Sequence, residues 1–235
     1  KGRVIPTSSA CTSGSHGIGY AYEAIKHGQQ KMMIAGGCEE LSATQAAVFD
    51  TLFATSLQND HPELSPRPFD KSRDGLVIGE GAGMLVLEEL DSALQRGAPI
   101  LAEIVGFGTN SDGAHITQPN SATMQIAMEM ALRDAALQPQ DIGYISAHGT
   151  ATDRGDIAET QATWRVFGHK PISSFKGYTG HTLGACGALE GIVSVHMMNE
   201  GWFHANANLS EVDPECGELD YIIGEPRQIN TDYVM

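Results

Sequence analysis

The sequence predicts a layered α/β domain, in which a buried sheet lies between helices. Segments with helical and with strand-like patterns of apolar residues alternate along most of the 235 residues. Hydrophobic residues make up 41% of the chain, which supports a substantial core. The 27 glycines, set against only 6% aromatic residues, indicate many turns and tight backbone packing.

The first elements are a helix, a strand and a second helix. An apolar stripe predicts a helix over residues 12–27, and Gly28 would end it. The run KMMIAGG (31–37) is typical of a short buried strand. A second helix is expected over residues 42–54, with Ser42 as its N-cap.

The middle of the chain begins with a loop. Residues 58–75 hold three prolines and many charges, which favours irregular structure. The runs GAGMLVLEEL (81–90) and ILAEIVGFGTN (100–110) predict two strands joined by a short helix through Leu94. GEGAG (79–83) leads into a strand, so it predicts a close backbone crossing in a crowded core and not a phosphate loop. A helix follows over residues 121–137, capped by Ser121.

The last third continues the alternation. The segment IGYISAHGT (142–150) predicts a strand that runs into a loop. Residues 153–167 are expected to form a helix, and PISS (171–174) a strand. The final helix is expected over residues 181–200, with Gly201 as its stop.

A faint internal repeat supports a duplicated architecture. When Cys11 is placed over Gly184, two pairs of glycines coincide: Gly14 with Gly187, and Gly28 with Gly201. Both segments begin with small residues and continue as an apolar helix. Two related halves would explain this pattern.

Composition narrows the function classes. The formal charge of -15, from 29 acidic and 14 basic residues, disfavours nucleic acid and anionic membranes as partners. The four cysteines form no CxxC motif, which predicts reduced thiols and a cytoplasmic protein. No signal peptide and no 18-residue apolar run is present, so no membrane association is expected. The chain opens in mid-pattern without an initiator Met, which suggests a piece of a longer protein.

Cys11 is the first candidate for chemistry. It precedes a predicted helix and lies among small Ser, Thr and Gly residues. A helix N-terminus lowers the pKa of a thiol, and small neighbours let a substrate approach the sulfur. The alternative is a buried structural cysteine.

Two histidines on glycine-rich segments are the next candidates. His148 follows a predicted strand, where functional loops emerge in α/β sheets. His181 would open a helix, whose dipole and the nearby Lys176 favour neutral imidazole. A neutral imidazole can donate an N–H to a developing oxyanion. Taken alone, His148 could be a structural histidine and Lys176 a solvated loop lysine. The histidines show no metal-ligand spacing such as HExxH, and no metal is expected.

Four motifs in order resemble those of the β-ketoacyl-acyl carrier protein synthases, the condensing enzymes of the thiolase superfamily. They are SSACTSG, RPFDKSRDGLVIGEGAG, AHGTATDRGDIAE and SSFKGYTGHTLGACGALE, and they span most of the chain. The resemblance implies a thiolase-like fold, layered α-β-α-β-α with two pseudo-symmetric halves and only partly covered by this chain. Residues 1–100 would be the end of the N-terminal half, which carries the nucleophile. Residues 101–235 would be most of the C-terminal half, which carries the two histidines.

The resemblance also implies an activity. This would be decarboxylative Claisen condensation of an acyl-enzyme thioester with malonyl-acyl carrier protein, as in fatty acid elongation. The implied partners are acyl carrier protein and a second copy of the chain in a homodimer. No cofactor would be bound directly, because the substrates are carried on the phosphopantetheine of the carrier protein.

Roles for single residues follow by motif. Cys11 is similar to the acyl-accepting nucleophile, and its own N–H would form part of an oxyanion hole. His148 and His181 resemble the pair that stabilises the enolate, and Lys176 resembles the lysine that orients and polarises the His181 site. The remaining matches are substrate-binding and supporting positions: Thr150 and Thr152 for the phosphopantetheine arm, and Asp156, Glu159 and Glu190 as acidic supports.

Other functions stay open on the sequence alone. They are a polyketide ketosynthase, a thiolase-like acyltransferase, and an inactive structural or interaction fragment. For docking of an acidic carrier protein, the basic trio Arg67, Lys71 and Arg73 is the candidate surface. Neutralisation of this trio by Asp70 and Asp74 within a structural loop is the alternative.

Overall fold

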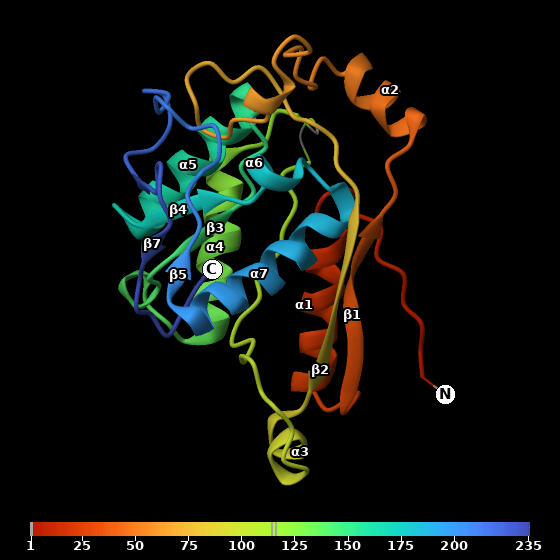
Figure 1. The fold of residues 1–235 in the computed structure, drawn as a ribbon. Coiled ribbons are helices and arrows are strands. Elements are labelled where there is room, and N and C mark those ends of the chain that lie inside the picture. The colour runs from red at the N-terminus through yellow and green to blue at the C-terminus, as the bar shows by residue number, and fades with distance from the viewer. Residues whose placement is uncertain (1, 114, 116) are drawn as a thin grey trace.

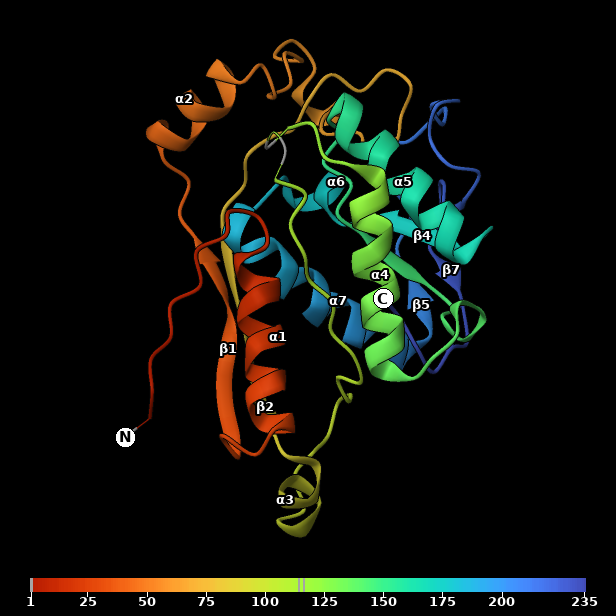
Figure 2. The same ribbon diagram turned by 180° about the vertical axis from the view of Figure 1, so that it is seen from behind.

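Helices and sheets alternate in layers in the computed structural model, which describes residues 2–113, 115 and 117–235 (Figures 1 and 2). A two-stranded antiparallel sheet of β1 (Met32–Glu39) and β2 (Gly81–Glu88) forms the first layer. Two helices pack on one face of this sheet, α1 (Ser13–Lys26) and α7 (Cys186–Glu200). The expected helix over 12–27 and the strand over 31–37 are therefore confirmed to within a few residues.

A second sheet lies on the other side of α7. It is parallel and has the strand order β3 (Ile145–Ala147), β4 (Pro171–Ser174), β6 (Asp220–Tyr221). A short antiparallel ladder joins β5 (Trp202–Phe203) to β7 (Arg227–Gln228). Two helices that pack on each other form the outer layer, as Figure 2 shows: α4 (Ser121–Ala135) and α5 (Asp153–Phe167). The shorter helices are α2 (Ala43–Thr51), α3 (Leu90–Gln95), α6 (Lys176–Thr179) and the 3-10 turns Pro62–Leu64, Pro139–Asp141 and Leu183–Ala185.

Apolar side chains cover the parallel sheet on both faces. One cluster joins the sheet to α4 and α5 through residues that include Leu132, Ile145, Phe167, Ile172 and Tyr221. The second cluster faces α7 and contains Tyr144, Phe203, Ala205 and Ile222, with Met197 and Met198 against it. Burial on both faces is typical of parallel sheets, and it gives the predicted sheet between helices.

Glycines allow the layers to approach at the start of α7. A Cβ at Gly37 would overlap the Gly184 carbonyl oxygen, and one at Gly36 would overlap the Gly83 carbonyl oxygen. A Cβ at Gly79 would overlap the Thr179 carbonyl oxygen, so the GEGAG segment makes a close backbone crossing, as predicted. The equated glycines of the repeat also behave alike. Gly28 and Gly201 follow the ends of α1 and α7 with φ of +69° and +73°.

Three expectations differ from the structure. Residues 100–110 belong to no strand; instead Gly106 and Gly108 bring this segment against the backbone of α4. The N-cap of α4 is Asn120, whose side chain accepts two backbone N–H bonds, and not Ser121. The last helix begins at Cys186, because Leu183 has a left-handed φ of +47° that prevents a continuous helix from His181.

No helix within residues 2–113, 115 and 117–235 combines the length and the apolar character needed to cross a bilayer.

Candidate active site

Cys11 and His181 meet near the N-terminal ends of α1 and α7. Cys11 lies just before α1, whose N-cap is Thr12, and its Sγ is 2.9 Å from His181 Nε2. The segment that follows the charged loop anchors His181 through its backbone. The His181 N–H donates to the Val77 carbonyl (2.7 Å), and the Gly79 N–H donates to the His181 carbonyl (2.9 Å). Residues 170 positions apart in the chain are thus fixed against each other.

His181 is a neutral imidazole with a defined tautomer. The Leu183 N–H donates to His181 Nδ1 at 3.2 Å, so Nδ1 is the acceptor and Nε2 carries the proton. Only 2% of the residue is exposed, and this burial, reinforced by the Lys176 ammonium, lowers the pKa of His181 to about 3. Its Nε2–H therefore points at the Cys11 sulfur.

His148 is likewise a neutral imidazole with its proton on Nε2. Its ring stands nearly perpendicular to that of His181, with 5.0 Å between the ring centroids. The Lys176 ammonium donates to His148 Nδ1 at 3.2 Å, which leaves the proton of a neutral ring on Nε2. Enclosure of the ring by protein and the Lys176 charge hold the pKa of His148 well below its ordinary value. The residue as a whole is exposed to solvent, so the fixed charge of Lys176 is the firmer of these two causes.

Lys176 is a buried ammonium, not a solvated loop lysine. It is 1% exposed, forms an ion pair with Glu190 and also donates to the His148 carbonyl at 2.6 Å. Burial by itself would lower the pKa of Lys176, but the Glu190 carboxylate outweighs it and raises this pKa. The lysine therefore stays charged and holds both histidines neutral.

Two carboxylates on one face of α5 hold the loop that carries His148. Glu159 accepts the N–H groups of His148 (2.6 Å) and Gly149 (2.8 Å). Asp156 accepts those of Thr150 (3.0 Å) and Phe69 (2.8 Å). Burial raises the pKa of Asp156 to about 7, although these N–H bonds and a nearby guanidinium oppose the rise. The three-residue spacing of these carboxylates places them together, as expected.

Arg73 holds the backbone at Thr152 and Asp153, next to the two threonines. Thr150 and Thr152 place their hydroxyl oxygens 2.9 Å apart. The Arg73 side chain is only 2% exposed and donates to the carbonyls of Thr152 (3.3 Å) and Asp153 (2.8 Å). It also forms an ion pair with Asp213 at 2.6 Å.

The basic trio does not form a free patch of positive charge. Arg73 is buried, and Arg67 donates to the Leu64 carbonyl and lies 3.7 Å from Asp70. Only Lys71 is largely exposed, and it is paired with Glu211 at 3.0 Å. The alternative, neutralisation by Asp70 and Asp74, holds for Asp70 alone. Lys71 and Arg73 pair with Glu211 and Asp213 instead, and Asp74 accepts hydrogen bonds from Ser56 and Leu57.

The electrostatics of Cys11 differ from the expectation. Burial raises the pKa of the Cys11 thiol, with the Lys176 charge as the main opposing influence. The sequence had suggested a lowered pKa at the first turn of a helix. Cys11 lies before the N-cap, and the surrounding protein removes water from the sulfur, so the helix dipole does not dominate.

Both family models that match the chain describe the same family. "Beta-ketoacyl synthase, N-terminal domain" covers residues 1–93, and "Beta-ketoacyl synthase, C-terminal domain" covers residues 101–210. The chain belongs to the β-ketoacyl synthase family.

Relatives of this β-ketoacyl synthase chain agree in sequence and fold. It is 42% identical to 3-oxoacyl-[acyl-carrier-protein] synthase 2 of Synechocystis over 238 residues, which are 97% of this chain and 56% of the relative. A β-ketoacyl synthase structure from Burkholderia phymatum is 62% identical with a TM-score of 0.97, covering 99% of this chain and 57% of that one. The ketosynthase structure AntDE:AntF, described as a type II polyketide acyl-carrier protein in complex with its ketosynthase bound to the hexaketide, is 35% identical (TM-score 0.91; 97% and 57% covered).

The chain thus spans rather more than half the length of these relatives. Its fold is the thiolase-like α/β fold of the ketosynthases, of which it holds part. The predicted fold class and family are confirmed.

Sequence reasoning missed two side chains of this candidate site. Glu39 accepts the Gly184 N–H at 3.0 Å, and Cys186 donates its thiol to the Cys11 carbonyl at 3.4 Å. Glu39 ends β1, so the same rule that singled out His148, a polar residue at a strand end, could have found it. Cys186 lies within a motif that was noted, but nothing in the pattern shows that its thiol turns toward Cys11.

Backbone strain accompanies the site residues. Ala10, Ala151 and Leu183 have φ of +53°, +63° and +47°, which is uncommon for residues other than glycine. They stand next to Cys11, between the two threonines, and beside the His181 loop. Strain of this kind costs about 1–3 kcal/mol per residue and concentrates at functional sites.

The Cys11, His148 and His181 side chains fit a metal poorly. Their candidate ligand atoms lie within 4.8 Å of one another, a spacing that a metal ion could use. Metal binding at Nε2 would move each ring proton to Nδ1, where it would face the Leu183 N–H or the Lys176 ammonium. The pair is therefore built to donate hydrogen bonds.

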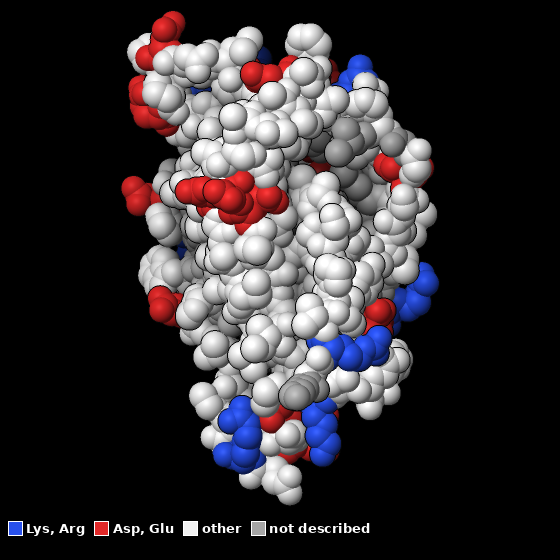
Figure 3. Space-filling view, turned by 90° about the vertical axis from the view of Figure 1, so that its right-hand side faces the viewer, with Lys and Arg blue, Asp and Glu red and all other residues white. Residues whose placement is uncertain are grey.

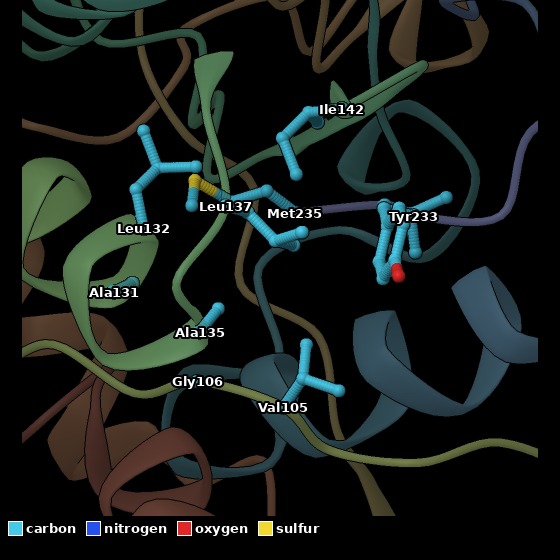
Figure 4. Close-up of a pocket in the computed structure, with 10 residues that line it drawn as sticks. Val105, Gly106, Ala131, Leu132, Ala135, Leu137, Ile142, Tyr233 and Met235 are labelled. Atoms are coloured by element: carbon cyan, nitrogen blue, oxygen red, sulfur yellow. The ribbon is translucent and has the colours of Figure 1, made fainter. Parts of the chain in front are cut away.

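An apolar cavity of about 60 Å³ lies elsewhere in the molecule (Figure 4). Its lining includes Val105, Leu132, Leu137, Ile142 and Met235, and it contains none of the predicted site residues. Its walls offer little polar chemistry beyond the Tyr233 side chain, so it is not a candidate catalytic site.

Proposed function

We propose that this chain carries the catalytic residues of a decarboxylative Claisen condensation, in which an acyl group on Cys11 reacts with malonyl-acyl carrier protein to give β-ketoacyl-acyl carrier protein. The observation that carries the proposal is the placement of two neutral imidazoles, both protonated on Nε2, around one thiol. The relatives of the chain include 3-oxoacyl-[acyl-carrier-protein] synthase 2, which supports fatty acid elongation as the pathway in which the condensation takes place.

The first half-reaction loads the acyl group. The Cys11 sulfur attacks the carbonyl of an acyl thioester, and the phosphopantetheine thiol of the carrier protein leaves with the proton. The Cys11 N–H contributes to the oxyanion hole for the tetrahedral intermediate. His181 Nε2 is 2.9 Å from Sγ, so the enolate that His181 later stabilises forms beside the acylated sulfur.

The second half-reaction uses the same two donors on another oxygen. The malonyl thioester carbonyl accepts the Nε2–H groups of His148 and His181, and loss of CO2 places the negative charge on that oxygen as an enolate. The enolate carbon then attacks the Cys11 thioester, and the Cys11 thiolate leaves. Lys176 keeps both imidazoles neutral throughout, so that they remain donors.

The other members of the site hold substrate or support the loops. Thr150 and Thr152 contact the phosphopantetheine arm. Asp156 and Glu159 fix the loops, and Glu190 fixes Lys176.

The partners are acyl carrier protein, supported by the related AntDE:AntF complex, and a second copy of the chain. Residues 1–100 and 101–235 form the two halves, no cofactor is bound directly, and the protein works in the cytoplasm. The same chemistry also serves polyketide extension, which the hexaketide-bound relative supports as the second candidate.

Peptide mass mapping tests the nucleophile. After the full chain meets an acyl-carrier-protein thioester, the acyl group is expected on Cys11 alone of the four free cysteines. Cys216 and Cys186 are buried, and burial raises the pKa of Cys186 to about 12 and that of Cys216 to about 11. An acyl group on Cys38, Cys186 or Cys216, or an inert Cys11, would contradict the assignment and favour a non-enzymatic role.

The His181→Ala variant separates the half-reactions. It is expected to acquire acyl on Cys11 but to release CO2 from malonyl thioester about 10²–10³ times more slowly, the usual loss for one oxyanion donor. Release of CO2 is followed with the wild type as reference. Unimpaired release in the variant would remove His181 from the enolate site.

A further inference from the structure

Glu39 connects the β1–β2 sheet to the loop that carries His181. Its carboxylate lies at the end of β1, and both oxygens are occupied: Oε2 accepts the Gly184 N–H at 3.0 Å, and Oε1 accepts Gln45 Nε2–H at 2.5 Å. The Ser42 N–H donates to Gln45 Oε1 at 3.0 Å, which fixes the orientation of that amide. The capping box of α2 therefore holds the carboxylate in place.

Three consecutive contacts lead from Glu39 to the nucleophile. Glu39 holds the N–H of Gly184, the adjacent Leu183 N–H donates to His181 Nδ1, and His181 Nε2 faces Cys11 Sγ. Leu183 has a left-handed φ of +47°, so the direction of its N–H depends on the shape of this turn. The tautomer of His181 in turn depends on that N–H.

We propose that Glu39 is a positioning residue for the condensation, because its carboxylate fixes the 183–185 turn and so keeps the His181 Nε2–H directed at Cys11. The inference rests on the proposed function for its effect on rate. Its effect on the His181 ring can be measured without it.

The neighbouring carboxylates do not share this position. Acidic side chains gather near one end of the face that β1 and β2 form (Figure 3). Glu39, Glu40 and Glu80 line an open hollow at the end of β1. Glu80 accepts the Leu41 N–H, and Glu40 is exposed. Glu40 is thus a matched control for charge and location.

The test compares three variants of the full chain with the wild type. Glu39→Ala removes the acceptor. Glu39→Gln alone would set its amide N–H against that of Gln45, so the rescue variant is the double exchange Glu39→Gln with Gln45→Glu, which restores both hydrogen bonds. Glu40→Ala is the control. Each is assayed for kcat and KM of CO2 release from malonyl thioester, for thermal unfolding, and by ¹⁵N–¹H NMR of the His181 ring.

The expected result is a split between kcat and KM. Glu39→Ala lowers kcat about 10-fold or more, as misplacement of a reacting group does, with KM within about 3-fold. Its His181 signal shows mixed tautomers, whereas the wild type, Glu40→Ala and the double exchange keep Nε2–H, and the double exchange recovers kcat to within about 3-fold of wild type.

Two outcomes overturn the inference. One is a folded Glu39→Ala variant with wild-type kcat and a single His181 tautomer. The other is a folded double exchange as impaired as Glu39→Ala. If the wild type itself releases no CO2, the proposed function fails, and the NMR comparison alone decides whether Glu39 positions His181.

Discussion

His181 shows how burial fixes protonation at the scale of one residue. The ordinary pKa of histidine is about 6.5, and burial with the Lys176 charge lowers that of His181 to about 3 in the folded chain. Between these two values the unfolded chain binds a proton that the folded chain does not. The folded state is therefore destabilised as the pH falls from about 6.5 toward 3.

This linkage gives a pH-dependent prediction. Between pH 7 and pH 5 the wild type is expected to lose about 2 kcal/mol more unfolding free energy than His181→Gln, which has no titrating ring. Urea unfolding of both proteins at the two pH values measures the difference. Parallel losses in the two proteins would show that His181 titrates normally in the folded state.

Residue identities at the site could be predicted from sequence, but their environments could not. The Cys11, His148 and His181 side chains were found from their setting and motifs, and the structure brings them together. The burial of Lys176 and Arg73 was not foreseen, because their partners Glu190 and Asp213 come from other elements. The predicted direction of the Cys11 pKa shift was wrong for the same reason, since burial depends on the tertiary structure.

Elements were predictable where the local signal was sufficient. The bounds expected for α5 and β4 are those observed, since each has a clear period and a clear boundary. Residues 100–110 have strand-like composition but lie against α4, and strand formation needs a partner that local sequence does not specify. The start of α7 was misplaced because the left-handed turn at Leu183 leaves no sequence signature.

Glycine contacts between elements give a prediction about stability. Gly37→Ala is expected to cost about 1–3 kcal/mol of unfolding free energy, because its Cβ would overlap the backbone oxygen of Gly184. Gly191→Ala is the control, since nothing lies within 4 Å of a Cβ at this position inside α7. It is expected to be neutral or to stabilise by about 0.5–1 kcal/mol. Equal costs in denaturant unfolding would mean that the contact between β1 and the 183–185 turn is looser than described.

Arg73 acts at the scale of the whole molecule, because it ties the segment before β2 to the C-terminal part of the chain. Its buried guanidinium bonds to the carbonyls of Thr152 and Asp153 and pairs with Asp213. Arg73→Ala leaves these groups without their cation and is expected to cost about 3–5 kcal/mol of unfolding free energy. Arg154→Ala, an exposed arginine bonded to Gln118, should stay within about 0.5 kcal/mol. A similar small loss in both variants would argue against this role.

The exposed apolar side chains on the outer face of the β1–β2 sheet affect how the isolated protein behaves in solution. Ile34 and Val86 are direct cross-strand partners, yet they are 72% and 64% exposed, and Met84 beside them is 55% exposed. Contiguous apolar surface of this kind attracts other apolar surfaces. A polypeptide of these 235 residues is therefore expected to bind hydrophobic dyes and to scatter more light as its concentration rises. The double variant Ile34→Lys with Val86→Glu, which keeps a cross-strand pair, should reduce both signals. Identical signals from the variant and the wild type would place the responsible apolar surface elsewhere on the protein.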